Sequence, residues 1–382
     1  MRFRFFSSPW GPIAAGAVIG VLAALLACQA LPGWLGNPPN MGLCVGCFTR
    51  DIAGALGLHR AAAVQYLRPE IIGLVFGALL AALAFGEFRV RAGSSPLVRF
   101  FLGVFASIGM LVFLGCPWRA YLRLAGGDLN SLLGLAGLCA GVAAGVVFLR
   151  DGFSLGRNRP APRASGFLLP ALLAALLILL LAAPVFSPGG PIFFTGRSPE
   201  GKPLGPGALH AFWAVSLFSG LLIGFLAQRS RFCTIAGIRD LLLMGDRHLL
   251  WGILAFILSA AAANLILGRF HAGFSGQPVA HADHFWNFAS MTLAGLCFVL
   301  AGGCPGRQLV LAGEGDGDAA VFFLGLLGGA AVAHNFALTG APETATSPGG
   351  PNDWGRWAVV AGLFFCAAMG LLMREPRTEE GG

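Results

Sequence analysis

Apolar residues are concentrated in ten stretches of about 20 residues each, separated by short segments rich in Gly, Pro and Arg. A helix of this length, rising about 1.5 Å per residue, spans the hydrocarbon core of a bilayer, which is roughly 30 Å thick. The pattern therefore predicts an all-α, polytopic membrane protein with about ten transmembrane helices. The stretches lie near residues 13–31, 70–88, 97–115, 130–149, 166–186, 208–227, 249–268, 286–303, 319–339 and 354–373.

The first stretch has a second interpretation. Arg2 and Arg4 precede it and Leu25-Leu26-Ala27-Cys28 resembles a lipoprotein processing site, so it could be a cleaved secretory signal. No clean small-x-small cleavage site follows. We expect it to remain as a permanent span, because the internal repeat described below requires it.

Composition agrees with a membrane protein. Hydrophobic residues make up 56% of the 382 residues and charged residues only 11%, against about 25% charged in soluble domains. The net charge of +8 comes from basic residues scattered between apolar stretches. Nucleic-acid binding needs cations clustered on a polar face, so no nucleic-acid partner is expected.

The basic residues also predict an orientation. With a cytoplasmic N-terminus and ten spans, the inside segments carry most of the 25 Lys and Arg residues, including the most basic loop, 150–165. By the positive-inside rule, both termini face the cytoplasm and segments 187–207 and 340–353 face outward. We expect the inner (plasma) membrane of a cell, with the lipid bilayer as the surrounding partner.

The two halves of the chain repeat one another at an offset of 188 or 189 positions. The matching features are Cys44 with Arg50-Asp51 against Cys233 with Arg239-Asp240, Gly115-Cys116-Pro117 against Gly303-Cys304-Pro305, and Gly127-Asp128 against Gly315-Asp316. The repeats are 1–186 and 187–382, in one integral membrane domain. Because five spans are an odd number, the second repeat should insert upside down, which places a solute site near the midplane.

Four short elements interrupt the spans. The segments 41–58 and 232–244 are apolar but too short to cross beside their Arg-Asp pairs, so they predict re-entrant half-helices packed in protein or lining a wet cavity. Pro117 and Pro305 suit the first position of a helix, where no N–H is needed. Cys116 and Cys304 would then stand at helix N-termini.

The cysteines in these breaks are the candidate functional residues. A helix N-terminus favours an anion, and a soft, polarizable sulfur suits sulfur or selenium ligands. The expected substrate path is Cys44, Cys116, Cys233 and Cys304. By contrast, four cysteines within apolar stretches are interpreted as small core residues: Cys28, Cys139, Cys297 and Cys366.

Charged residues beside the path are candidate supporting groups, because ionisable residues at membrane depth are functional candidates by default. The arginines could attract an anion or pair with the aspartates, and the Arg-Asp pairs could equally be structural clamps. The set is Arg50, Asp51, Arg119, Asp128, Arg239, Asp240, Arg307 and Asp316.

Cys47 forms a Cys-x-x-Cys with Cys44, which could be a redox or metal site. The equivalent position in the second half is Ala236, so we expect Cys47 to be accessory. Only His281 and His284 show a paired histidine spacing. No metal or cofactor is expected.

The segments 44–60, 115–119 and 123–128, together with the Cys elements of the second half, resemble the YeeE/YedE family of membrane proteins and its selenium-metabolism YedE branch. The resemblance implies uptake of thiosulfate or a similar solute along a constricted path, where single cysteines pass the ion on through S–H contacts. It makes Cys44 and Cys116 the outer stations and Cys304 and Cys233 the inner ones. It also implies a small cytoplasmic sulfur-carrier protein of the TusA/YedF type as a partner.

The leading hypothesis is therefore a transporter importing a small sulfur- or selenium-containing solute, without enzyme activity. The chain has no Gly-x-x-x-x-Gly-Lys-[Ser/Thr] loop, which implies conduction or secondary transport. The alternatives are a membrane thiol enzyme or sulfurtransferase using Cys44 and Cys47, and an assembly subunit without transport. An enzyme needs one reactive cysteine pair, whereas a transport path needs a cysteine that contacts the solute in each half of the chain. The sequence has such cysteines in both halves, which favours the path.

Overall fold

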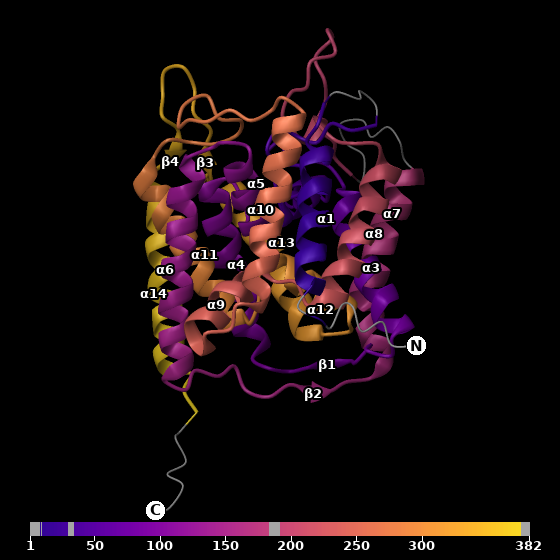
Figure 1. Cartoon of the computed structure of the whole chain (residues 1–382), viewed down its shortest axis with the longest axis vertical. Helices are drawn as coiled ribbons and strands as arrows, with labels where there is room; N and C mark the ends of the chain where they lie inside the picture. The colour runs from indigo at the N-terminus through magenta and orange to yellow at the C-terminus, as the bar shows by residue number, and fades with distance from the viewer. Residues whose placement is uncertain (1–7, 9, 30–33, 183–191, 376–382) are drawn as a thin grey trace, which may run out of the picture.

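The computed structural model describes residues 8, 10–29, 34–182 and 192–375, and the described part is a bundle of roughly parallel and antiparallel helices (Figure 1). Arg2, Arg4 and the predicted boundary between the repeats at 186–187 lie outside the described residues. The longer helices are α1 (Trp10–Leu26), α3 (Pro69–Ala84), α4 (Pro96–Phe113), α6 (Asn130–Arg150), α7 (Leu168–Ala182), α8 (Trp213–Ser230), α10 (His248–Ile266), α11 (His284–Ala301), α13 (Gly317–Asn335) and α14 (Asp353–Leu372).

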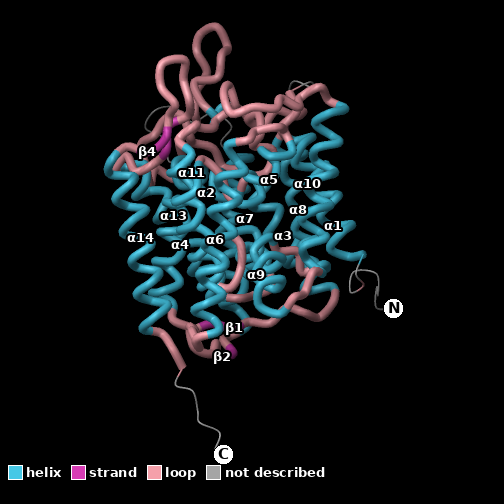
Figure 2. The backbone as a smooth tube through the Cα atoms, turned by 60° about the vertical axis from the view of Figure 1, so that its left-hand side comes forward, coloured by secondary structure: helices cyan, strands magenta, loops and turns pink. Residues whose placement is uncertain are grey.

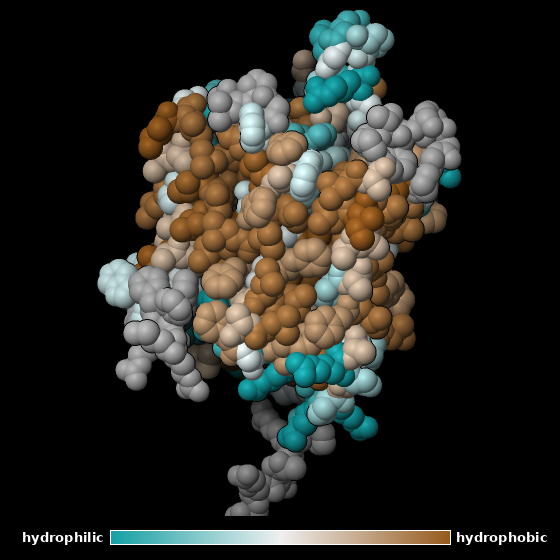
Figure 3. Space-filling view, turned by 90° about the vertical axis from the view of Figure 1, so that its right-hand side faces the viewer, coloured by the Kyte–Doolittle hydropathy of each residue, from teal (hydrophilic) through white to brown (hydrophobic). Residues whose placement is uncertain are grey.

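Each of these helices coincides with one predicted apolar stretch. Within the described residues, eight helical segments are long and apolar enough to cross a membrane by length and composition, and α1 and α3 are shorter apolar helices. Large apolar side chains cover the outside, as at Ile266, Phe364 and Leu372. On the face drawn in Figure 3, hydrophobic residues cover the middle and hydrophilic residues lie toward both ends. The prediction of an all-α polytopic membrane protein is confirmed.

Four short helices lie between the long ones: α2 (Val45–Ala55), α5 (Pro117–Ala125), α9 (Thr234–Met244) and α12 (Pro305–Gly313). α2 and α9 each have 11 residues, and α5 and α12 each have 9. They occupy the segments where half-helices were predicted. The short 3₁₀ helices are η1 (Arg163–Phe167) and η2 (Pro206–Ala208).

Two small antiparallel ribbons mark the two ends of the bundle. One pairs β1 (Arg91–Ala92) with β2 (Arg159–Pro160), and the other pairs β3 (Gly340–Ala341) with β4 (Gly350–Pro351). They lie at opposite ends, as both ribbon views show (Figures 1 and 2). We call these the β1 end and the β3 end.

The long helices pack in pairs that join the first half of the chain to the second: α1 with α10, α3 with α8, α4 with α13 and α6 with α11. Glycines line each contact on both sides. In the pair α3 and α8, a Cβ added at Gly77 would collide with the carbonyl of Leu221, and one at Gly224 with the carbonyl of Leu74. Small residues let helix backbones approach closely, and this packing is a common source of helix association in membranes.

The order of the elements recurs along the chain, so that α1 to α7 correspond in turn to α8 to α14. The turns after α5 and α12 share one conformation, since Gly127 and Gly315 have φ of 94° and 95°. The last helices of the two sets run in opposite directions. α7 follows β2 at the β1 end, whereas α14 follows β4 at the β3 end (Figure 1).

Candidate functional site

The four cysteines of the expected path each stand at the N-cap of a short helix. Cys44 precedes α2, Cys116 precedes α5, Cys233 precedes α9 and Cys304 precedes α12. N-cap side chains usually accept hydrogen bonds from the first-turn N–H groups, which have no partner within the helix. Here sulfur takes that place, and all four thiols face the positive end of a helix.

Three of the four sulfurs accept a hydrogen bond from the backbone three residues on. The donors are the N–H groups of Cys47 for Cys44 at 3.3 Å, of Ala236 for Cys233 at 3.4 Å and of Arg307 for Cys304 at 3.3 Å. Ala236 can replace Cys47 in this role because only the backbone participates.

The cysteines come together in two pairs, one from each half of the chain. The backbone N–H of Cys116 donates to the sulfur of Cys44 at 3.5 Å, and the two thiols interact. The thiols of Cys233 and Cys304 interact in the same way. Cys44 and Cys116, which lie 72 positions apart in the sequence, therefore meet at the first pair.

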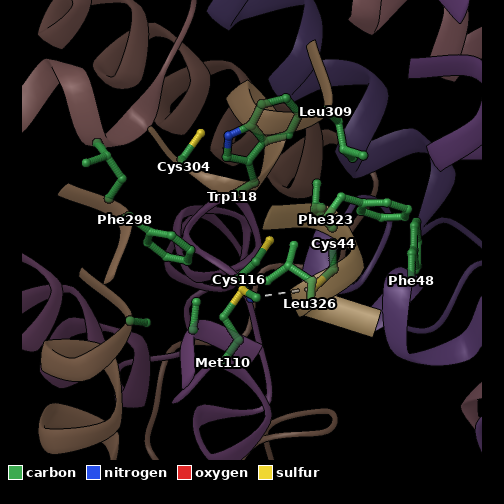
Figure 4. Close-up of a cluster of buried hydrophobic side chains, with 14 of the residues drawn as sticks. Cys44, Phe48, Met110, Cys116, Trp118, Phe298, Cys304, Leu309, Phe323 and Leu326 are labelled. Carbon is green, nitrogen blue, oxygen red and sulfur yellow. Dashed lines mark hydrogen bonds between the residues drawn. The ribbon is translucent and has the colours of Figure 1, made fainter. Parts of the chain in front are cut away.

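All four thiols are buried, with 0% exposure for Cys44, Cys116 and Cys304 and 2% for Cys233. Aromatic and aliphatic side chains surround them, including Phe48, Met110, Phe298, Leu309, Phe323 and Leu326 (Figure 4). In this conformation the thiols lie inside the core, so a solute reaches them only when neighbouring groups move.

Arg119 places a full positive charge beside the first pair. Its side chain is 0% exposed, and its guanidinium donates to the sulfur of Cys47 at 3.6 Å. The remaining donors contact the carbonyls of Asn40 and Val279, both at 3.0 Å, and of Leu114. None of the ion pairs found among the described residues involves Arg119. Its charge is therefore met by carbonyl dipoles and a thiol, without a carboxylate.

Asp51, by contrast, is held between two arginines. It pairs with Arg50 at 2.7 Å and with Arg68 at 2.6 Å, and all three side chains are buried. Arg68 also donates to the carbonyls of Pro206 and Leu209. This geometry makes the Arg50–Asp51 pair a structural clamp that fastens α2 to the start of α3. Arg68 was not predicted from the sequence, although an arginine directly before Pro69 at the start of an apolar stretch is a usable signal.

Asp128 pairs with Arg123 at 2.6 Å and not with Arg119, so Arg119 does not take the alternative of pairing with this aspartate. The turn after α5 folds the carboxylate of Asp128 back over the last turn of that helix, which carries Arg123. Its other oxygen accepts from the N–H of Asn130 at 3.0 Å. This buried ion pair lies at the end of α5, and because Asp128 bonds to Arg123 it does not neutralise Arg119.

In the second half, only Arg239 and Asp240 pair as expected, at 2.7 Å, and they are partly exposed. Asp316 instead pairs with Arg91 of the first half at 2.7 Å, and Arg307 pairs with Glu314 at 3.2 Å. Arg307 therefore does not take the alternative of pairing with Asp316. The turn after α12 caps α13 with Asp316, whose other oxygen accepts from Ala319.

A cavity of about 240 Å³ near β1 collects charged residues of both halves. Four arginines and two glutamates line it, and Arg231 bridges Glu87 at 2.9 Å and Glu314 at 3.1 Å. The lining residues are Glu87, Arg89, Arg91, Arg231, Arg307 and Glu314. One lining residue, Arg307, also contacts the second cysteine pair, because its backbone N–H donates to the sulfur of Cys304.

Electrostatics within the cavity leave a positive excess. Burial alone would raise the pKa of Glu87, but the hydrogen bond from Gln228 and the ion pairs with Arg229 and Arg231 hold that pKa below its ordinary value. Glu87 is therefore ionised at neutral pH and neutralises only part of the arginine charge. Of the lining residues, only Arg307 was a candidate from the sequence, since the others come from segments that are far apart in the chain.

The described residues contain no group of three or more His, Cys, Asp or Glu side chains that could hold a metal ion. His281 is buried and its Nε2 bonds to the carbonyl of Val112 at 2.9 Å. Burial lowers the pKa of His281 to about 4, so the ring is neutral at pH 7 and donates this bond.

The remaining cysteines are free thiols, as all nine are. Cys28 is buried, and Cys297 contacts Cys366 across α11 and α14 with a sulfur–sulfur distance of 3.4 Å. Cys139 is exposed on the outer face of α6, so its interpretation as a core residue is wrong. Apolar residues occur on all faces of α6, so the sequence does not predict which face is exposed.

Fold and site together define a polytopic α-helical membrane protein with paired thiols and an unpaired cation in its core. A family model described as sulphur transport matches residues 1–106 and 229–380, which is more than half of the chain. The chain belongs to this sulphur transport family, the YeeE/YedE family. The matched ranges contain Cys44, Cys233 and Cys304, whereas Cys116 lies between them. A comparison with curated proteins gave no match.

Proposed function

We propose that this chain imports a small sulfur- or selenium-containing anion, with thiosulfate as the model solute, along Cys44, Cys116, Cys304 and Cys233. Membership of a sulphur transport family supports transport of a sulfur compound. The observation that carries the choice of an anion is Arg119, a fully buried cation with no carboxylate partner among the described residues, directly beside the first cysteine pair.

A buried charge without a counter-ion is costly, typically by several kcal/mol, even when its hydrogen bonds are satisfied. Carbonyl dipoles satisfy the donors of Arg119 but leave a net positive charge in the core. An anion at the first pair would compensate that charge. The N-termini of α2 and α5 add partial positive charge at the same place.

We further propose that residues 1–186 and 187–382 are inverted repeats. The support is the recurrence of the same elements in the same order, the matching φ values of Gly127 and Gly315, and the opposite directions of α7 and α14. In this arrangement the half-helices of both repeats meet in the middle of the bilayer, where inverted-repeat transporters bind their solutes.

The orientation follows from the arginines. The cavity near β1 is lined by four arginines, which favours a cytoplasmic position for the β1 end under the positive-inside rule. We assign the protein to the inner (plasma) membrane with both termini inside. Cys44 and Cys116 are then the outer stations, Cys304 and Cys233 the inner ones, and the arginine-lined cavity the inner mouth. A cytoplasmic sulfur-carrier protein of the TusA/YedF type would receive the sulfur there.

One observation favours a second candidate, a membrane sulfurtransferase. Cys44 and Cys47 form a Cys-x-x-Cys at the start of α2, which is the spacing of a redox pair, and the guanidinium of Arg119 lies beside Cys47. The second half has Ala236 in place of the later cysteine, so the Cys-x-x-Cys is present in one half only. The thiol pairs Cys44–Cys116 and Cys233–Cys304 are present in both halves, as a transport path requires, and we therefore favour transport.

The direct test is uptake of radiolabelled thiosulfate, selenite and sulfate into proteoliposomes containing the purified protein. We expect accumulation of thiosulfate or selenite above that in empty vesicles, and little sulfate, because a hard oxyanion gains nothing from the thiols. A protein that accumulates none of the three, or sulfate as fast as thiosulfate, is not the transporter proposed.

A further inference from the structure

Trp118 stands between the two cysteine pairs. It is the second residue of α5, two positions after Cys116, and it is only 1% exposed. In Figure 4 its indole lies between Cys116 on one side and Cys304 on the other.

The ring packs against the start of both short helices of the second half. It meets the ring of Phe232, the residue before Cys233, edge to face with centroids 5.9 Å apart. It also lies against Gly306, two residues after Cys304, where an added Cβ would come within 2.5 Å of Cζ2 and 2.8 Å of Cε2. Position 306 is the one that corresponds to position 118 in the repeat. The two equivalent positions thus face each other, and only one can carry a large side chain.

The indole nitrogen of Trp118 has no hydrogen-bond partner among the described residues, although it is buried. Buried Trp N–H groups normally find an acceptor, because an unmade bond costs about 1–3 kcal/mol. Nε1 is bonded to Cε2, the ring atom that lies over Gly306, so the N–H is beside the N-terminus of α12. Figure 4 shows the nitrogen on the side of the ring that faces Cys304.

We propose that Trp118 Nε1–H, the thiol of Cys304 and the N-terminus of α12 form a central anion subsite between the two cysteine pairs. An anion there accepts from the indole, faces the positive end of a nine-residue helix and places its sulfur against a thiol. The ring itself separates the pairs and admits the solute by moving. This subsite rests on the proposed function, and it adds a specificity residue that is not a cysteine.

The test is the dissociation constant of thiosulfate for purified protein in detergent, measured by calorimetry for the wild type, Trp118→Phe and Trp354→Phe. Phe keeps an aromatic ring but removes the N–H. We expect the dissociation constant of Trp118→Phe to rise about tenfold, the effect of one hydrogen bond to an anion. Trp354 is 71% exposed at the start of α14, so Trp354→Phe should bind like the wild type.

A second variant guards against misfolding at position 118. Gly306→Ala leaves the tryptophan in place but forces its ring aside, and it should weaken thiosulfate binding as much as Trp118→Phe. Gly328→Ala in α13 is the matched control. Binding within twofold of the wild type for either variant at 118 or 306, with unchanged melting temperature, overturns the subsite. If instead the wild type itself binds no thiosulfate, the proposed function fails before the subsite is tested.

Discussion

The sulfur of Cys44 accepts two backbone N–H groups, from Cys47 at 3.3 Å and from Cys116 at 3.5 Å. One atom is thereby held at the N-termini of two short helices, α2 and α5, that come from separate parts of the first half. The two hydrogen bonds fix the position of this sulfur. An anion that approaches it meets the positive ends of both helices.

The first prediction concerns the stations. Replacing Cys44, Cys116 or Cys304 with Ala should abolish thiosulfate uptake while protein levels stay near normal, because each change removes a sulfur contact without opening a large cavity. Cys233→Ala should be milder, since Thr234 is adjacent and buried. Uptake by proteoliposomes is the measurement. Cys28→Ala, Cys139→Ala and Cys366→Ala are the controls, and equal losses in both groups would assign the cysteines to packing.

The second prediction separates transport from enzyme chemistry. If Cys44 and Cys47 exchange a disulfide or a persulfide, Cys47→Ala should be as damaging as Cys44→Ala. If Cys44 is a contact station, Cys47→Ala should retain most uptake, because its backbone N–H still caps Cys44 and Ala236 serves in the other half. An inactive Cys47→Ala protein that is folded and abundant would favour the sulfurtransferase.

The third prediction concerns charge. Arg119→Gln should reduce thiosulfate uptake at least tenfold by removing the unpaired cation, and Arg119→Lys should recover part of it, since Lys keeps the charge but not the guanidinium fork. Arg68→Gln is the comparison. It leaves Asp51 with one partner in place of two, so it should lower the melting temperature, as broken buried ion pairs cost about 3–5 kcal/mol. If Arg119→Gln transports normally, the anion assignment loses its main support.

The fourth prediction is a pH dependence of stability. Burial lowers the pKa of His281 from 6.5 to about 4. Between those values the unfolded imidazole binds a proton and the folded one does not, so stability falls as the pH drops from about 6.5 to 4. The loss is roughly 3 kcal/mol at about 1.4 kcal/mol per pKa unit. Melting temperatures from pH 7 to pH 4 should fall less for His281→Gln than for the wild type or for His271→Gln, where the side chain is exposed. Identical profiles would refute this assignment.

The fifth prediction is the topology. A reporter that is active only in the cytoplasm should work when fused after Arg374 and fail when inserted at Gly201. Arg374 follows α14 at the β1 end, while Gly201 lies in the loop that precedes α8 at the β3 end (Figure 1). The reverse pattern would place the arginine-lined cavity outside and reverse the order of the stations.

Much of the fold could be predicted because its signals are local. The length of each apolar stretch determines a span, and Pro117 and Pro305 mark the first residues of α5 and α12 because proline needs no N–H partner there. The repeat at 188 positions aligned Cys116 with Cys304, and both prove to be N-caps. Such features need only neighbouring residues in the chain.

The charge partners were less predictable because they depend on how distant segments meet. Asp316 pairs with Arg91, 225 positions away, and Asp51 takes Arg68 as a second partner. The repeat suggested that Arg119 and Arg307 behave alike, yet Arg307 has a glutamate and Arg119 has none. Trp118 was overlooked for a similar reason, because its importance comes from facing Gly306 across the two halves.

The glycine-lined helix pairs restrict how this protein can move. At the glycines of α3 and α8 the two backbones are in direct contact, so no side chains lie between them that could change rotamer during a sliding motion. The other three helix pairs that join the halves also have glycine contacts. A rigid-body rotation of one half against the other would therefore have to break the contacts of all four helix pairs at once. We therefore expect solute passage to depend on small shifts of the short helices and of single side chains such as the Trp118 ring. The paired long helices are expected to keep their positions.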